Sequence, residues 1–136
     1  MIIKSYQVQN NKSNFLKCNF FLFYGENLGL KKDIRKIVKA EINQKKNVED
    51  LFLYENEILN NEKNFYNLIY GGSLFSKKKI ITIYNATDKI SEKINDIYEK
   101  HPEDTYIIVF SEILEKKSKL RIFFEKNKKA ICIPCY

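Results

Sequence analysis

The fold is decided by the stretch Asn19-Phe20-Phe21-Leu22-Phe23-Tyr24, which Gly25 follows at once. A continuous apolar and aromatic run of this length is typical of a strand buried on both faces, as in a parallel sheet. The apolar residues after it recur at helical spacing, with charges between them: Leu30, Ile34, Ile37 and Val38. This spacing predicts an amphipathic helix from about Gly29 to Glu41. The chain therefore opens with a strand, a glycine turn and a helix.

The same alternation continues through the rest of the chain. Further apolar runs predict strands at 51–54, 79–84, 105–110 and 130–133. Helical patterns lie between them: one from Asn60 or Asn61 to Tyr70, stopped by Gly71-Gly72, one capped by Asp88, and one at about 117–127. We therefore predict an α/β fold, a five-stranded parallel sheet with helices on both faces. Residues 2–8 fit either an extra strand or a loose arm.

Composition indicates one packed domain, since 44% of the 136 residues are hydrophobic. The net charge is +7, but of 24 basic residues only Arg35 and Arg121 are arginines. Arginine is preferred for bidentate base and phosphate contacts, so sequence-specific DNA reading is not expected. We interpret most lysines as solvated, with a DNA-facing surface as the alternative. No apolar stretch approaches the roughly 18 residues of a membrane span, which predicts a soluble, cytoplasmic protein.

Cysteine usage is typical of a reducing compartment, because the chain has an odd set of three: Cys18, Cys132 and Cys135. The last two form a CxxC pattern that ends a β-like run, whereas a redox pair has its first thiol at a helix N-terminus. A zinc site would need two more ligands, and only Cys18 and His101 offer them. We interpret the cysteines as small buried hydrophobes, with a metal or redox site as the alternative.

The glycine turn after the first strand lies where a P-loop, G-x-x-x-x-G-K-[ST], would bind phosphate. Laid from Gly25, the sequence reads Gly25-Glu26-Asn27-Leu28-Gly29-Leu30-Lys31-Lys32. Gly25 and Lys31 match the motif. Leu30 replaces the second glycine, and Lys32 replaces the hydroxyl that holds magnesium. We interpret this turn as a degenerate P-loop without a nucleotide cofactor. Lys31 fits a solvated helix face, with a residual phosphate contact as the alternative.

The strand ends also lack the adjacent acids that hold magnesium in P-loop enzymes. The third strand ends at Tyr84-Asn85, and the fourth at Phe110-Ser111-Glu112. Asp88 and Glu112 are interpreted as helix caps or surface charges. His101 is the only histidine and falls in a predicted loop, so no Ser-His-Asp set is visible. The domain is predicted to contain no catalytic residues and no metal.

Two strings of residues carry a family resemblance. One is the strand that ends in Tyr24-Gly25-Glu26, and the other is Gly72-Ser73-Leu74-Phe75-Ser76, which precedes basic residues and a β-branched strand. In strand order and spacing, the region from about Phe20 to Tyr136 is similar to the delta subunit family of the bacterial DNA polymerase III clamp loader. The resemblance implies an AAA+-like first domain of the replication machinery without a working ATP site, and not itself an enzyme.

The resemblance also implies a partner and a contact. The family's delta subunit binds the ring-shaped sliding clamp, the beta subunit, and opens one of its interfaces with a small hydrophobic wedge. The matching residues here are Leu74 and Phe75, after Ser73; the family has another large apolar residue where this chain has Gly72. Exposed apolar residues in such a turn are typical of interface anchors. The alternative is that Leu74 and Phe75 fold back as a hydrophobic contact at the helix end or a core lid.

Family members continue with a lid domain and a collar domain that assembles the loader with its other subunits. Residues 1–136 are therefore expected to form a single AAA+-like N-terminal domain, with lid and collar absent from this chain. We expect any DNA contact to be weak and non-specific. Two other functions stay open: a basic domain that binds DNA through lysines and aromatic residues, and an active P-loop NTPase.

Overall fold

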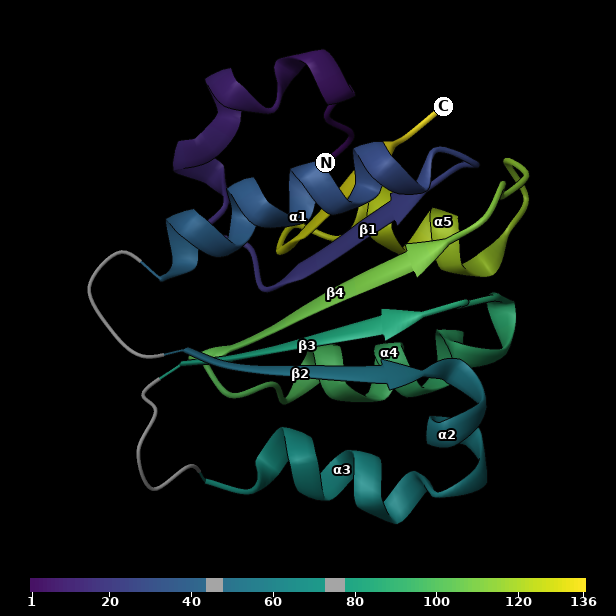
Figure 1. Ribbon diagram of the computed structural model, residues 1–136. Helices are drawn as coiled ribbons and strands as arrows, with labels where there is room; N and C mark the ends of the chain where they lie inside the picture. Colours follow the sequence, from purple (N-terminus) through teal and green to yellow (C-terminus); the bar gives the residue numbers. More distant parts are fainter. Residues whose placement is uncertain (44–47, 73–77) are drawn as a thin grey trace.

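A computed structural model describes residues 1–43, 48–72 and 78–136 (Figure 1). Its strands form one all-parallel sheet in the order β2-β3-β4-β1-β5. The strands are β1 (Phe20–Tyr24), β2 (Val48–Tyr54), β3 (Lys78–Tyr84), β4 (Thr105–Ser111) and β5 (Ala130–Pro134). The prediction of a five-stranded parallel sheet is confirmed, with β1 in an interior position between β4 and β5.

The helices lie between the strands, as the apolar spacing predicted. They are α1 (Leu28–Ile42), α2 (Glu55–Asn60), α3 (Glu62–Tyr70), α4 (Ser91–Glu99) and α5 (Lys119–Lys126). The sequence did not predict α2, because a helix this short buries a single apolar side chain, Ile58, and shows no helical period. No helix within the described ranges is long and apolar enough to cross a membrane.

The predicted helix caps are confirmed in one case and wrong in another. The Asn61 side chain accepts a hydrogen bond from the backbone N–H of Asn64 (3.1 Å) and caps α3. Asp88 does not cap the helix that follows it. Its carboxylate accepts hydrogen bonds from the Ser118 hydroxyl (2.6 Å) and the Leu120 N–H (3.2 Å), and the first of these lowers the pKa of Asp88. Asp88 therefore anchors the start of α5, a long-range contact that local sequence does not reveal.

The two faces of the sheet are covered unequally. Right-handed crossovers put a connecting helix on one face when the chain moves across the sheet in one direction, and on the other face when it returns. The crossover from β1 to β2 runs outward, and the later ones run back, so α1 lies on one face and α2 to α5 on the other. Figure 1 shows α1 on one side of the sheet, with α3 and α4 on the opposite side.

Two apolar clusters fill the space between the sheet and its helices. Inner residues of α2 to α5 meet one face, including Ile58, Phe65 and Phe124. Ile34, Val38 and Ile42 of α1 meet the other. The aromatic stretch of β1 contributes to both clusters by alternation, with Phe20 and Leu22 on the first face and Phe21 and Phe23 on the second. This burial on both faces confirms the interpretation of the opening run.

The first eighteen residues pack beside α1 over the β5 side of the sheet. Ile2 forms a single parallel bridge with Cys132, and two 3-10 turns follow at Ser5–Gln7 and Gln9–Asn14. Apolar side chains of this segment enter the cluster under α1: Ile3, Val8, Phe15 and Cys18. The segment is therefore neither a full strand nor a loose arm.

Gly25 is required by the turn after β1. Its φ is +125°, and a Cβ atom there would lie 2.0 Å from the backbone oxygen of Cys135. We expect Gly25→Ala to lower the free energy of unfolding by about 2 to 4 kcal/mol, since backbone strain and overlap add. Chemical denaturation measures this. Gly72→Ala is the control, because its Cβ would meet nothing within 4 Å. Equal stability of the two variants would contradict the close approach of Cys135.

Candidate functional site

The connection between β1 and α1 is too short to be a phosphate-binding loop. Only Gly25, Glu26 and Asn27 separate the strand from a helix that begins at Leu28. Asn27 is the N-cap, and its side-chain oxygen accepts a hydrogen bond from the Leu30 N–H (3.0 Å). Residues 28–32 of the P-loop alignment are therefore helical, whereas a P-loop holds its phosphates in a glycine-rich loop ahead of the helix.

Backbone amides of this turn donate to the protein itself. The Gly25 N–H faces the carbonyls of Ser111 (3.2 Å) and Glu112 (3.1 Å), and the Asn27 N–H donates to Cys135 (3.2 Å). These are the positions from which a P-loop would direct amides at a phosphate. An incoming phosphate would have to displace hydrogen bonds that join the ends of β1, β4 and β5. The turn therefore acts as a structural joint, in the sense that its amides connect the ends of β1, β4 and β5 by hydrogen bonds.

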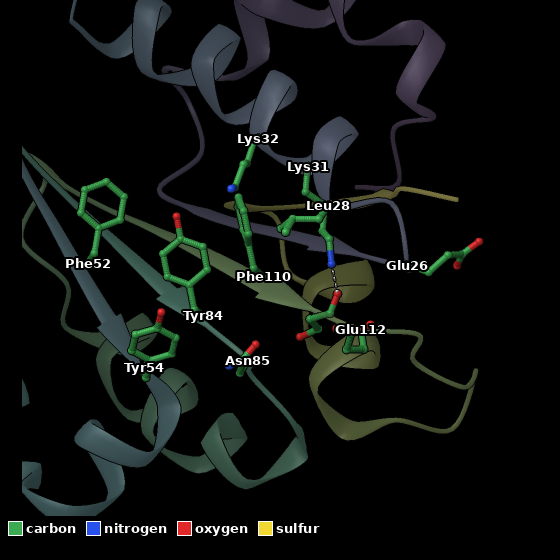
Figure 2. A pocket seen from close by; sticks show the side chains of 11 residues that line it. Glu26, Leu28, Lys31, Lys32, Phe52, Tyr54, Tyr84, Asn85, Phe110 and Glu112 are labelled. Atoms are coloured by element: carbon green, nitrogen blue, oxygen red, sulfur yellow. Dashed lines mark hydrogen bonds between the residues drawn. The ribbon is translucent and has the colours of Figure 1, made fainter.

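Lys31 completes this joint from the first turn of α1. The side chain is buried, and its ammonium group donates to the carbonyls of Gly25 (2.7 Å) and Ser111 (2.9 Å). Figure 2 shows Lys31 directed toward this end of β4. The interpretation of Lys31 as a solvated helix residue is wrong. Amphipathic spacing failed here because a lysine can bury its charge where strand-end carbonyls supply acceptors.

The strand ends carry no acidic pair in the described part of the chain. Asn85 follows β3 with a φ of +56°, an uncommon conformation for a non-glycine residue. Glu112 follows β4 and is exposed, as a surface charge would be, while Asp88 is engaged at the start of α5. The exposure of Glu112 fits its interpretation as a surface charge, whereas Asp88 is bonded at the start of α5 and not as the cap of its own helix.

A cavity of about 460 Å³ opens beside this turn, at the carboxyl ends of β2, β3 and β4. Figure 2 shows the rings of Phe52, Tyr54, Tyr84 and Phe110 along it, with Lys32 from α1 at its margin. Ligands of open parallel sheets commonly bind outside the carboxyl ends of the strands. Sequence reasoning missed this aromatic wall, because it interpreted Leu51-Phe52-Leu53-Tyr54 only as a short strand.

The three cysteines are buried, which confirms their interpretation as small hydrophobes. Cys132 and Cys135 contribute to the clusters on opposite faces of the sheet, so their thiols do not converge. Burial raises the pKa of Cys132 to about 12 and that of Cys135 to about 11, far from the thiolate form. His101 Nδ1 donates a hydrogen bond to the Tyr98 carbonyl (3.0 Å), and the ring packs against Phe20.

Both arginines of the chain have structural partners within the fold. Arg35 pairs with Asp50 and also donates to the Thr82 hydroxyl (3.0 Å). Arg121 pairs with Glu125 (3.2 Å), so both arginines of the chain are engaged within the fold. Engaged guanidinium groups are not available for base edges, which supports the expectation of no sequence-specific DNA reading.

Lys79 holds the end of α3, just before the segment that the sequence analysis singled out. Its buried ammonium donates to the carbonyls of Leu68 and Gly71 (2.9 Å for Gly71), the usual role of a cation at a helix C-terminus. Residues Ser73, Leu74 and Phe75 lie outside the described residues. The structure therefore describes what flanks the predicted clamp contact: the end of α3 on one side and the start of β3 on the other.

In a comparison with protein families, residues 21–136 match the model for the DNA polymerase III delta subunit. The chain belongs to the DNA polymerase III delta subunit family. No curated protein matches the chain at a significant level. The delta subunit is a component of the clamp loader, so the chain belongs to a family of the DNA replication machinery. The matched region includes all of β1 except Phe20 and every later strand, while the whole N-terminal segment over β5 precedes it.

The hydrogen bonds of the Lys31 ammonium in this delta-family chain predict that the side chain contributes to the free energy of unfolding. We expect Lys31→Met to lower the free energy of unfolding by about 1 to 3 kcal/mol, because two carbonyls at buried strand ends lose their donor. Lys32→Met, at the exposed neighbouring position, should change it by less than about 0.5 kcal/mol. Urea denaturation of both variants measures the difference. Unchanged or higher stability of Lys31→Met would show that burying the ammonium group cancels the gain from its hydrogen bonds.

Proposed function

We propose that this chain is the AAA+-like N-terminal domain of a clamp-loader delta subunit, and that it binds the sliding clamp and helps to open it without ATPase activity of its own. Membership of the delta family over residues 21–136 is the observation that carries this proposal. The parallel sheet with a strand-turn-helix opening is consistent with it. In this proposal the domain acts through binding alone, and the energy for clamp loading comes from other subunits.

The turn after β1 supports the absence of ATPase activity. A triphosphate needs free amides, a free lysine ammonium and a magnesium site. Here the amides of Gly25 and Asn27 are engaged, and the Lys31 ammonium is occupied by two carbonyls. Asn85 stands at the end of β3, where an acidic residue would be required.

The end of α3 supports a clamp contact at Leu74 and Phe75, with Ser73 before them. A wedge transmits force only if the element behind it is held in place. The C-terminal carbonyls of α3 are held by Lys79, and its Phe65 and Ile69 are buried against the sheet. This arrangement gives a fixed base on which an apolar pair can press into a clamp pocket.

Other loader subunits and DNA complete the proposed set of partners. Lid and collar domains of the full delta subunit would make the contacts with other subunits, as the family resemblance implies. DNA contact through this domain would be weak and without sequence preference, because both arginines are engaged and the free basic groups are lysines.

The clamp contact predicts a separation of binding from stability. Leu74→Ala combined with Phe75→Ala should weaken clamp capture by roughly 30-fold or more, since loss of an interface hot spot costs about 2 to 4 kcal/mol. The melting temperature should change little, because exposed side chains contribute little to folding. Surface plasmon resonance against the cognate clamp and thermal unfolding measure the two quantities.

Leu16→Ala combined with Ile113→Ala is the matched control, since both side chains are exposed and lie far from α3 in the sequence. This variant should capture the clamp normally. If the double change at Leu74 and Phe75 instead lowers stability by several kcal/mol, the two residues belong to the core. Intact clamp affinity in a well-folded variant would remove them from the contact.

The closed turn predicts no tight nucleotide binding. Isothermal titration with Mg-ATP should give no saturable heat at tens of micromolar nucleotide, because the Gly25 and Asn27 amides and the Lys31 ammonium are already engaged within the protein. Phosphate release should stay at the level of the buffer. A dissociation constant in the low micromolar range would contradict the proposal, and loss of that binding in Lys31→Met would assign it to this turn.

A further inference from the structure

The cavity beside the turn lies apart from the residues that flank the proposed clamp contact. It lies at the carboxyl edge of the sheet, whereas Gly71 and Lys79, which flank the proposed clamp contact, lie at the amino edge. Its volume of about 460 Å³ is within the usual range for small-ligand pockets. Figure 2 shows that residues from α1 and from three neighbouring strands converge on it.

A row of aromatic rings forms one wall of the cavity. Tyr84 is the central ring, with Phe52 stacked beside it (centroids 6.0 Å apart, planes at 19°) and Tyr54 at 5.8 Å. Phe110 meets Tyr84 edge-on at 5.1 Å. Phe52 and Tyr54 are 50% and 51% exposed, although they sit on the face that α1 covers elsewhere. Phe110 is buried and Tyr84 half-buried behind these two exposed rings. Exposed aromatic rings in a concave site are typical of a surface that binds a planar ligand.

Polar side chains also line the cavity beside the aromatic wall. The Ser111 hydroxyl is buried (residue 1% exposed) and has no hydrogen-bond partner among the residues that the structure describes. Buried polar groups are otherwise almost always paired, and at a cavity wall the partner can be water or a ligand. Asn85, held at positive φ, and Glu112 line the same end of the cavity. Lys32 lines it from α1.

These features together describe the chemistry of one nucleobase. A base presents a flat face that stacks on tyrosine or phenylalanine, and an edge with both donors and acceptors. A hydroxyl, an amide and a carboxylate can pair with such an edge, whereas an aliphatic anchor would leave Ser111 unpaired. Lys32 provides one cation, enough for a single phosphate. A polyphosphate does not fit this description, because the amides of the turn and Lys31 are engaged.

We propose that this cavity binds a single unpaired nucleobase, stacked on Tyr54 and Tyr84, with its polar edge toward Asn85 and Ser111. A base of single-stranded DNA and a free nucleoside monophosphate share this chemistry. The aromatic wall provides the stacking, and Lys32 contacts the adjoining phosphate. The site is separate from the proposed clamp contact, so loss of one activity leaves the other intact.

The test measures base binding directly on the full chain. Fluorescence anisotropy with a labelled oligothymidylate at about 50 mM salt should show binding that an abasic oligomer of equal length does not match. Tyr54→Ala should weaken oligothymidylate binding about 5- to 150-fold, the range for loss of one stacked base. Tyr70→Ala is the matched control, since Tyr70 is 47% exposed but lies at the end of α3. Its affinity should equal that of the unaltered chain.

Two further measurements separate the sources of the base and the competing explanations. Thymidine monophosphate that shifts tyrosine NMR resonances and competes with the oligomer would assign the site to free nucleotides as well; no shift at millimolar concentration would assign it to DNA. Clamp capture by Tyr54→Ala should be unchanged, which distinguishes this inference from the proposed function. Equal binding of the abasic oligomer, or unchanged affinity of a folded Tyr54→Ala and Tyr84→Leu variant, would overturn the proposal. Failure of both oligothymidylate and thymidine monophosphate to bind would also overturn it, and burial of the aromatic wall by another loader subunit would then explain why the rings are exposed in this domain.

Discussion

The handedness of the parallel crossovers is the constraint on which the rest of this structure depends. Because the chain leaves β1 for the far edge of the sheet and then returns, a right-handed path puts α1 on one face and α2 to α5 on the other. A helix with its side chains is about 10 Å wide, whereas five strands about 4.8 Å apart span roughly 20 Å. The N-terminal segment covers the β5 side of α1, whereas Phe52 and Tyr54 near the carboxyl end of β2 stay about half exposed. The exposed aromatic wall is a consequence of this topology.

The same topology brings the ends of β1, β4 and β5 together, and the chain uses its own groups to join them. The Lys31 ammonium bridges two strand-end carbonyls, and the backbone of Cys135 meets both Tyr24 and Asn27. In a P-loop protein the corresponding groups would meet a phosphate, so stability here takes the place of nucleotide binding. These contacts hold the ends of the strands together through groups of the protein itself.

Local sequence was sufficient to predict the strands and most helices. It was insufficient to predict the role of a residue whose partner is distant in the sequence. The five apolar residues from Phe20 to Tyr24 had to be buried on both sides, and the spacing after Leu30 had to be helical. Asp88 could not be assigned from its neighbours, because its partners Ser118 and Leu120 are some thirty positions away. The degenerate P-loop could be recognised from Leu30 and Lys32, but the engagement of its amides by Cys135 and Ser111 could not.

The sequence by itself therefore determined the fold class, the delta-family resemblance and the loss of the phosphate-binding motif. These follow from apolar periodicity and from residue types at fixed spacing, which are local properties. Only the tertiary structure decided that Lys31 is buried, that Cys132 and Cys135 face opposite sides of the sheet, and that Phe52 and Tyr54 stay exposed. An apolar residue is compatible with a core and with a binding surface alike. An apolar residue becomes part of the core when another helix or segment packs over it, and part of the surface when none does.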